Sequence, residues 1–312
     1  MRKLLTLLIV AALIAAGAGF IAWAKQRPAV YYLSDLRSHI IGQPASSGSA
    51  HVVLIRPELY PMDFQSLEHL RLKLDAALKN AQAAKALPQN TLVVLPDHIG
   101  TWLLATGEKA EFYQARDRLE VRDWLLLGNP VLAIQVLLNN LDADRLDEAL
   151  LRMKAVQMAR DYQTLFAKLA KDYSVSIVAG SILLPEPSLE EGKIKVGEGR
   201  LRNLSAVFGP DGNIQEPVYT EPWPWRQGGA PAQRIKLGKT ELVLERSWQP
   251  GYPASQLRNL ATTQVSSQLY IRGHLSWPIG GAKGGVKLTP EYAPDASEQP
   301  GTHVLLEKLT DP

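Results

Sequence analysis

Thr91-Leu-Val-Val-Leu-Pro-Asp-His-Ile-Gly-Thr-Trp102 is the stretch on which the fold of this chain depends. Its apolar run, Leu92 to Leu95, is typical of a strand buried on both faces of a sheet. The run ends at Pro96, and an acid, Asp97, and a histidine, His98, follow at once. Polar residues just past the carboxyl end of such a strand lie where α/β proteins usually place ligands. The stretch predicts a central strand with a candidate functional site at its tip; a strand followed by an ordinary polar loop is the simpler alternative.

Strand and helix patterns alternate on both sides of this stretch. The β-branched segment His51–Ile55 predicts a strand. Apolar residues then recur at helical spacing over Leu67–Ala81, after Asp63 as the expected N-cap. A strand, a helix and a second strand in this order predict a parallel pair joined by a crossover. The pattern continues with an expected long helix, Leu146–Asp172, and a single buried strand, Val175–Leu184, with Gly180-Ser181 inside it.

The second half of the chain adds strands. Leu204–Phe208 and Asn213–Tyr219 flank the turn sequence Gly209-Pro-Asp-Gly212, which predicts a β-hairpin. The later segments are expected to form a strand, a helix and a possible edge strand, in the order Thr240–Leu244, Pro253–Gln268 and Thr302–Leu309. Together these elements predict an α/β fold, a mixed sheet layered with helices, in one domain from about residue 51 to residue 290. Residues 291–312 form a C-terminal tail in this division.

The amino terminus carries an uncharged apolar run, Leu4–Ala24. At about 1.5 Å per helical residue, such a run spans the roughly 30 Å hydrocarbon core of a bilayer. We expect residues 1–27 to form a transmembrane signal anchor, followed by a flexible linker at residues 28–50. The body then lies on the periplasmic, or extracytoplasmic, side of a bacterial-type inner membrane, as a single-pass protein. Secretion after cleavage at Ala22-Trp-Ala24 is the alternative.

A second apolar run, Pro130–Leu138, is too short to cross a membrane. Such a run is more often a buried helix of a soluble domain, and we expect that here. Contact with the membrane surface beside the anchor is the alternative.

Composition excludes several classes of function. The 34 basic and 31 acidic residues are interspersed, so no basic block indicates a nucleic-acid partner. Cysteine is absent, which excludes disulfides, thiolate metal sites and a cysteine nucleophile. The six histidines are scattered, and none pair at the spacing of a helical metal site. We therefore expect no metal and no cofactor.

Three of these stretches together resemble the nitrilase, or carbon-nitrogen hydrolase, superfamily. The first ends a strand in Pro96-Asp97, where the family has Pro-Glu. The second joins Val178-Ala-Gly-Ser181 to the hairpin Asn203–Gly212, which is similar to the family's Asn…Phe-Asp-Pro-Asp-Gly. The third, Leu242–Pro250, falls where the family has a strand that ends in its nucleophile. The resemblance covers His51 to about Leu288. It implies an α-β-β-α sandwich that usually forms a homodimer, and a Glu-Lys-Cys triad.

The three triad positions implied by the resemblance depart from the family's pattern. They carry Asp97 in place of the glutamate, Glu221 in place of the lysine and Leu244 in place of the cysteine. The family's chemistry needs a thiolate nucleophile and a positive charge where the oxyanion forms. Triad chemistry of the family type is therefore excluded. The residues expected to line the remaining binding site are Asp97, His98, Glu245, Arg246 and Trp223.

These observations predict a membrane-tethered carbon-nitrogen hydrolase-like domain that is a pseudoenzyme. Its expected role is to bind a small molecule or a protein partner as a homodimer. One alternative is a hydrolase of amide-type or nitrile-type bonds in which Asp97, Glu221 or Glu245 activates water, which requires these carboxylates to converge. A second alternative is a structural partner in an envelope complex, docking through the aromatic, proline-rich segment Tyr219–Trp225 with Trp223 as an anchor.

Overall fold

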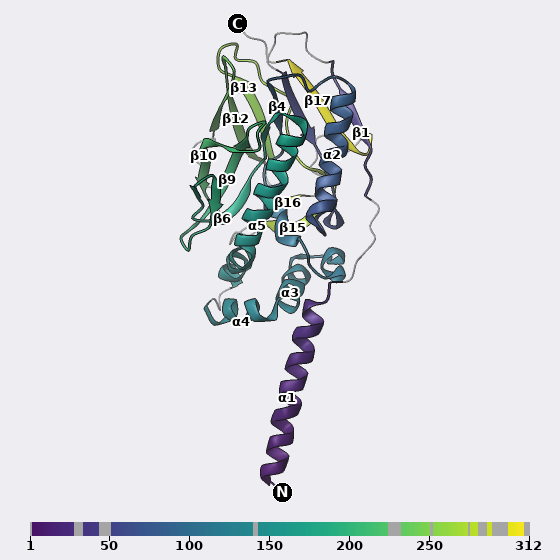
Figure 1. Ribbon diagram of the computed structural model, residues 1–312, viewed down its shortest axis with the longest axis vertical. Coiled ribbons are helices and arrows are strands. Elements are labelled where there is room, and N and C mark those ends of the chain that lie inside the picture. The colour runs from purple at the N-terminus through teal and green to yellow at the C-terminus, as the bar shows by residue number, and fades with distance from the viewer. Residues whose placement is uncertain are drawn as a thin grey trace.

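The chain folds into a mixed α/β body with one long helix, α1 (Arg2–Lys25), leaving it at one end (Figure 1). The computed structural model describes residues 2–27, 34–43, 51–139, 143–223, 232–249, 252–273, 275–279, 286–288 and 299–308. By length and composition α1 can cross a membrane, and among the described helices it alone meets that test. The prediction of an α/β chain with an N-terminal apolar helix is therefore confirmed.

An eight-stranded mixed sheet forms the centre of the body. Its strands run in the order β1 (Ser38–Ile41), β17 (Thr302–Lys308), β2 (His51–Arg56), β4 (Thr91–Val94), β5 (Ser176–Val178), β9 (Leu201–Phe208) and β10 (Ile214–Pro222), and β6 (Ile182–Pro185) also pairs with β9. β2, β4 and β5 are parallel, with Val53 opposite Val93 and Val93 opposite Ile177. β9 and β10 form the predicted hairpin. The predicted strand at Thr91 is thus central and buried on both faces.

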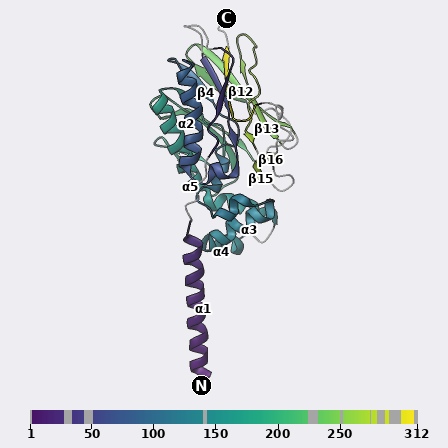
Figure 2. The same cartoon turned by 90° about the vertical axis from the view of Figure 1, so that its right-hand side faces the viewer.

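Two helices, α2 (Leu67–Ala83) and α5 (Ala143–Tyr173), cover one face of this sheet (Figure 2). Their apolar stripes pack with the sheet in one core cluster. The predicted N-cap of α2 was wrong by three positions. Ser66 caps the helix, because its Oγ accepts a hydrogen bond from His69 N at 3.1 Å. Asp63 instead lies in a short 3-10 turn, η1 (Pro61–Phe64), and accepts a hydrogen bond from Tyr60 N.

A second, three-stranded sheet packs on the opposite face of the large sheet. It consists of β11 (Ala232–Leu237), β12 (Thr240–Gln249) and β13 (Tyr252–Asn259). Aliphatic residues of β2, β4 and β5 meet those of the small sheet in a separate core cluster. The prediction of a helix over Pro253–Gln268 was wrong. That segment contains most of β13, whose residues pair with β12 along its whole length.

The body also takes in segments that were predicted to lie outside the domain. β1 comes from the expected linker at residues 28–50, and β17 comes from the expected tail at residues 291–312. β17 is not an edge strand, since it lies between β1 and β2. Its buried residues Val304 and Leu305 explain the position, because they complete the cores on the two faces of the sheet.

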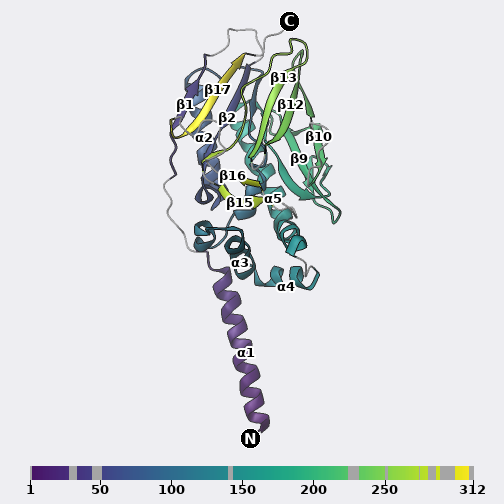
Figure 3. The same cartoon turned by 180° about the vertical axis from the view of Figure 1, so that it is seen from behind.

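The remaining described elements are short. They are β3 (Glu58–Leu59) with β14 (Arg272–Gly273), β7 (Ser188–Glu190) with β8 (Lys193–Lys195), β15 (Leu275–Ile279) with β16 (Val286–Leu288), the 3-10 turns η2 (Thr101–Ala105) and η3 (Ala110–Gln114), and the helices α3 (Arg118–Gly128) and α4 (Pro130–Asn139). α3 and α4 lie at the base of the body, beside the carboxyl end of α1, in all three views (Figures 1, 2 and 3).

Candidate functional site

The tip of β4 is packed tightly against the strand beside it. Leu95 N donates to Val178 O at 2.9 Å, which extends the pairing past the end of β4. Gly180 has a φ of +66°, and a Cβ on it would lie 2.0 Å from Pro96 O, so only glycine allows this approach. His98 also adopts a left-handed backbone conformation, with a φ of 59°, and its N–H donates to Ser181 Oγ at 2.8 Å. These contacts hold Asp97 at a defined place between the two sheets.

Asp97 forms a buried ion pair with Arg246 of β12. The Nε of Arg246 donates to Asp97 Oδ1 at 3.0 Å, and the two residues are 1% and 4% exposed. The Nη2 of Arg246 donates to Gln233 Oε1 at 3.0 Å, and its Cζ lies 4.8 Å from the centre of the Tyr219 ring. Burial alone would raise the pKa of Asp97, but the charge of Arg246 and hydrogen bonds from Ser181 and Arg246 lower it below its usual value.

Glu221 of β10 lies close enough to Arg246 for the two charges to interact. Asn203 Nδ2 donates to its Oε1 at 2.9 Å, and the Tyr219 hydroxyl donates to its Oε2 at 3.2 Å. Burial raises the pKa of Glu221, and the repulsion from Asp97 adds to this, while the hydrogen bond from Asn203 and the charge of Arg246 oppose it. The charges of Asp97 and Glu221 both raise the pKa of Arg246, against its own burial. We call these six residues the Arg246 cluster: Asp97, Asn203, Tyr219, Glu221, Gln233 and Arg246.

His98 and Trp223 lie beside the cluster. His98 is fully buried, and its Nε2 lies 4.0 Å from Asp97 Oδ2. Its Nδ1 lies 3.3 Å from Thr101 Oγ1, and its ring meets the Trp223 ring edge-on, with the ring centres 5.1 Å apart. Burial lowers the pKa of His98, so the imidazole is neutral at physiological pH. Trp223 is half-buried against the core, so its ring covers His98.

Leu244 and Glu245, the other two sequence-predicted site residues, are not members of the cluster either. Leu244 is buried in the core between the two sheets. Glu245 points to the other face of the small sheet, where Arg258 Nε and Nη2 donate to its carboxylate at 2.8 and 2.9 Å. Side chains alternate along a strand, so positions 244 and 246 share the inner face and 245 lies outside. The expectation that Glu245 and Arg246 act in one site was therefore wrong.

Several members of the cluster escaped sequence reasoning. Gln233 lies on β11, far from any recognised motif, and no local signal marks it. Asn203 and Tyr219 fall within the predicted hairpin, but a register shift between Gln215 and Tyr219 decides their partners. Asn203 faces Glu221 and Tyr219 faces Ser205, whereas an unbroken register from the turn would place Tyr219 opposite Asn203.

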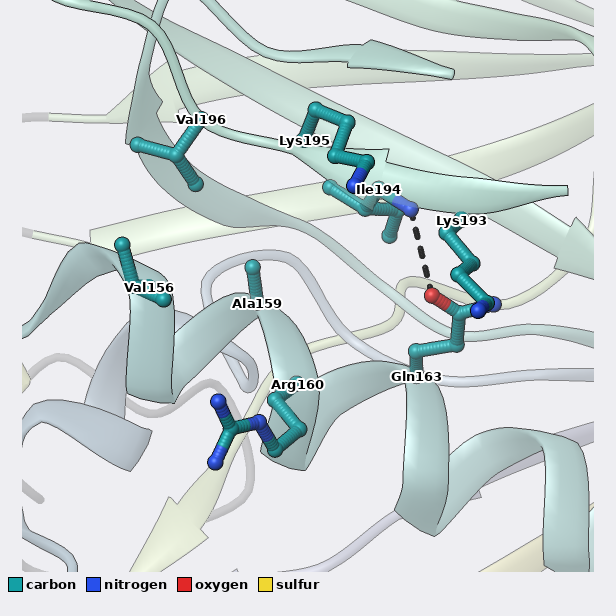
Figure 4. Close-up of a pocket in the computed structure, with 8 residues that line it drawn as sticks. All are labelled: Val156, Ala159, Arg160, Gln163, Lys193, Ile194, Lys195 and Val196. Atoms are coloured by element: carbon teal, nitrogen blue, oxygen red, sulfur yellow. Dashed lines mark hydrogen bonds between the residues drawn. The ribbon is translucent and has the colours of Figure 1, made fainter. Parts of the chain in front are cut away.

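A surface cavity of about 390 Å³ lies elsewhere, between α5 and the β7–β8 hairpin (Figure 4). Its rim carries the exposed cations Arg160, Lys193 and Lys195, and Ile194 N donates to Gln163 Oε1 at 3.1 Å beside them. None of the residues that line it belongs to the Arg246 cluster. In the part of the chain that the structure describes, no group of three or more His, Asp or Glu side chains could hold a metal ion.

The chemistry open to the Arg246 cluster follows from its members. A guanidinium stays protonated and is not a nucleophile, and here it is neutralised by Asp97. Asp97 and Glu221 have pKa values shifted in opposite directions, which is the arrangement that separates a base from an acid in carboxylate enzymes. In comparisons with known proteins, no family model matches the chain and no curated protein matches it.

Proposed function

We propose that the body is a nitrilase-like domain that has lost the family's catalysis and now binds a small molecule or a protein partner. α1 tethers it to a bacterial-type inner membrane, with the body on the extracytoplasmic side. The fold proposed is the family's α-β-β-α sandwich. Support for it comes from the α2–α5 layer on the large sheet, the packing of the two sheets and the order of the three motif segments, although the described helices supply only one of the family's two helix layers.

One observation supports the proposed loss of catalysis. A buried ion pair between Asp97 and Arg246 occupies the region in which the family's triad would lie. A developing oxyanion would have to compete with Asp97 for the guanidinium, which weakens the stabilisation that acyl transfer needs. Leu244 and Arg246, the inner-face residues of this part of β12, offer no nucleophile. The cluster is instead suited to holding β4, β10 and β12 together, which leaves binding as the remaining role.

A small ligand would find room in the cavity of Figure 4. The cations Arg160, Lys193 and Lys195 line it together with apolar side chains that include Val156 and Ile194, so an anion with an apolar part fits its chemistry. The proposal of a binding protein does not depend on this cavity, since a protein partner or a second copy of the chain could use another surface. Size-exclusion chromatography with light scattering tests the homodimer that the family resemblance implies.

Hydrolysis assays on the full chain in detergent test the loss of catalysis. We expect no turnover of a panel of aliphatic and aromatic amides and nitriles by the wild-type chain. Turnover that disappears in Asp97→Ala but persists in Glu245→Gln, which alters only the outer face of β12, would overturn the proposal. A thermal unfolding curve for each variant separates lost activity from lost folding.

The second candidate is a hydrolase in which a carboxylate activates water. The opposed pKa shifts of Asp97 and Glu221 favour it, and Glu245 is excluded from the role because it pairs with Arg258. This mechanism requires that the chain turns over a substrate and that the pH profile of turnover follows the titration of Glu221. It also requires that the substitution Glu221→Gln abolishes turnover. A flat pH profile, or activity in Glu221→Gln, would rule this mechanism out.

A structural role in an envelope complex is the third candidate. Its proposed anchor, Trp223, is half-buried over His98, so a partner would meet only part of the ring. Pull-down of partners with the wild-type chain and with Trp223→Ala would test it. Equal recovery of the same partner by both would exclude Trp223 as the docking residue.

A further inference from the structure

We propose that α4 and the end of α3 form a second membrane contact, in which α4 lies flat on the bilayer surface beside α1 and presents Val131, Leu132 and Ile134 to lipid. The inference rests on the proposed membrane anchoring of α1. It adds a surface element that sets how the body sits on the membrane.

The first observation behind this inference is that apolar residues of α4 and of the end of α3 are exposed. Val131 and Ile134 of α4 are 55% and 60% exposed, and Leu132 is also exposed. Leu127, at the end of α3 and three residues before α4 begins, is 43% exposed. Between Asp123 and Asp142 the sequence contains no charged residue. An apolar, uncharged helix surface at the base of a body is expected to be covered by lipid or by another protein.

Hydrogen bonds place this surface at the level where α1 leaves the membrane. Lys109 Nζ donates to the carbonyl oxygens of Trp23 and Gln26, at 2.8 and 3.1 Å, and so fixes the end of α1 to the body. Arg27 Nη2 donates to Gly128 O at 2.9 Å. Since Gly128 ends α3 and Pro130 begins α4, the start of α4 lies within one arginine side chain of the end of α1.

Aromatic residues mark the same level on α1. Phe20 and Trp23 stack with their ring centres 5.7 Å apart, close to the carboxyl end of the helix. Tryptophan concentrates at the boundary between hydrocarbon and water in membrane proteins. The Lys109 ammonium lies 3.9 Å from the centre of the Trp23 ring. If Trp23 lies at the boundary, this ammonium lies in the headgroup region, where a charged group remains hydrated.

The orientation of α4 fits an interfacial helix. In Figures 1 and 2, α4 runs across the direction of α1 instead of continuing along it. A helix that lies in the plane of the interface buries its apolar side about 5–10 Å into the boundary between headgroups and acyl chains. Lipid is the occupant favoured over a protein partner, because the surface is continuous with the proposed membrane span.

The absence of cysteine from the chain makes a site-specific test simple. Single variants Ile134→Cys, Leu72→Cys and Leu13→Cys of the full chain are labelled with an environment-sensitive fluorophore. They are reconstituted into vesicles of zwitterionic and anionic phospholipid that contain nitroxide-labelled lipid. Leu72 is the matched control, since it is a 40% exposed apolar residue of α2 and does not line the cavity of Figure 4. Position 13 reports on the anchor.

We expect the label at position 134 to lose several-fold more fluorescence to lipid nitroxides than the label at position 72. Its strongest quenching should come from nitroxides near the headgroup, whereas position 13 should respond most to nitroxides deep in the acyl chains. Quenching at 13 without quenching at 134 would overturn the inference and leave the anchor standing. No quenching at either position would refute the anchoring itself.

A second copy of the chain could cover α4 instead of lipid. In that case the emission of the label at 134 would change with protein concentration at a fixed lipid ratio and would not respond to nitroxide lipid, which also overturns the inference. Ile134 and Leu72 are exposed, so the labels leave the core intact, and equal thermal unfolding of both variants verifies this.

Discussion

The guanidinium of Arg246 brings a full charge between two sheets whose other contacts are largely aliphatic. Removing a charge from water costs several kcal/mol, and a partner charge with good geometry is needed to offset that cost. Asp97 supplies the charge and Gln233 an additional acceptor. Once one member of such a pair is lost, the other is left buried without compensation, so the pair should behave as a unit.

A double-mutant cycle measures this coupling. Asp97→Asn and Arg246→Met should each lower the free energy of unfolding by about 3–5 kcal/mol, because each leaves one buried partner uncompensated. The double variant should be destabilised by much less than the sum of the two. Chemical unfolding of the full chain in detergent gives the three values. Additive losses would show that the two side chains do not interact, and Glu245→Gln is the control, with an expected loss below about 1 kcal/mol.

The two carboxylates of the cluster should make opposite contributions to the pH dependence of stability. The folded pKa of Asp97 is lowered from 3.8, so its contribution is present above that pH and is lost as pH falls through the folded value. The folded pKa of Glu221 is raised from 4.5, so stability should fall as pH rises from 4.5 through the folded value.

Thermal unfolding from acidic to neutral pH distinguishes these contributions. Glu221→Gln should remove the loss above pH 4.5 and raise stability at neutral pH relative to wild type. Asp97→Asn should flatten the acid limb below pH 3.8. A Glu221→Gln variant with an unchanged pH profile would contradict the raised pKa of Glu221.

At the scale of elements, β12 shows how one strand serves two surfaces. Leu244 and Arg246 point inward and Glu245 points outward, as strand alternation requires. The inner residues join β12 to the large sheet, whereas Glu245 joins it only to Arg258 of β13. Neighbouring positions on this strand should therefore differ sharply in their effect on stability.

Alanine substitutions at adjacent positions of β12 test this orientation. Leu244→Ala should lower the free energy of unfolding by about 2–5 kcal/mol, because it opens a cavity between the sheets. Glu245→Ala should cost less than about 1 kcal/mol, because it removes only a partly exposed ion pair. Urea unfolding of the two variants gives the comparison. Equal losses would contradict the packing of β12 on the large sheet.

At the scale of the whole molecule, the main feature is the attachment of α1 to the body. Its end is held by Lys109 and Arg27, so the body is attached close to the end of the apolar helix. We therefore expect the chain to stay in the membrane fraction after alkaline extraction. Leu8→Arg with Leu13→Arg should release a large share of it, because each arginine near the centre of a span costs about 2.5–3.5 kcal/mol. Val265→Arg, on an exposed position of the body, is the control.

Amino-terminal sequencing of the extracted protein tests the alternative of cleavage after Ala24. A mature protein that begins past that residue and appears in the soluble fraction would contradict anchoring.

Local patterns in the sequence were sufficient for α1 and for the series β2, α2, β4 and α5, whereas the single strand predicted over Val175–Leu184 is divided into β5 and β6. Uninterrupted apolar runs and helical spacing are properties of neighbouring residues. They predict a helix or a strand correctly wherever the tertiary contacts favour the same structure as the local pattern. The hairpin of β9 and β10 was predictable for the same reason, since Pro-Asp-Gly chemistry acts within its own turn. The sequence also placed Asp97 at the tip of a central strand.

Only the tertiary structure decided how distant segments complete one another. Tyr252–Asn259 is a strand because β12 offers it a partner, and β17 is internal because β1 adds to its free edge. The shift in β10 brings Glu221 opposite Asn203, and the inner face of β12 brings Arg246, not Glu245, to Asp97. The physical reason is the same in each case: strand pairing and buried charge compensation depend on groups far apart in the chain, which no local pattern encodes.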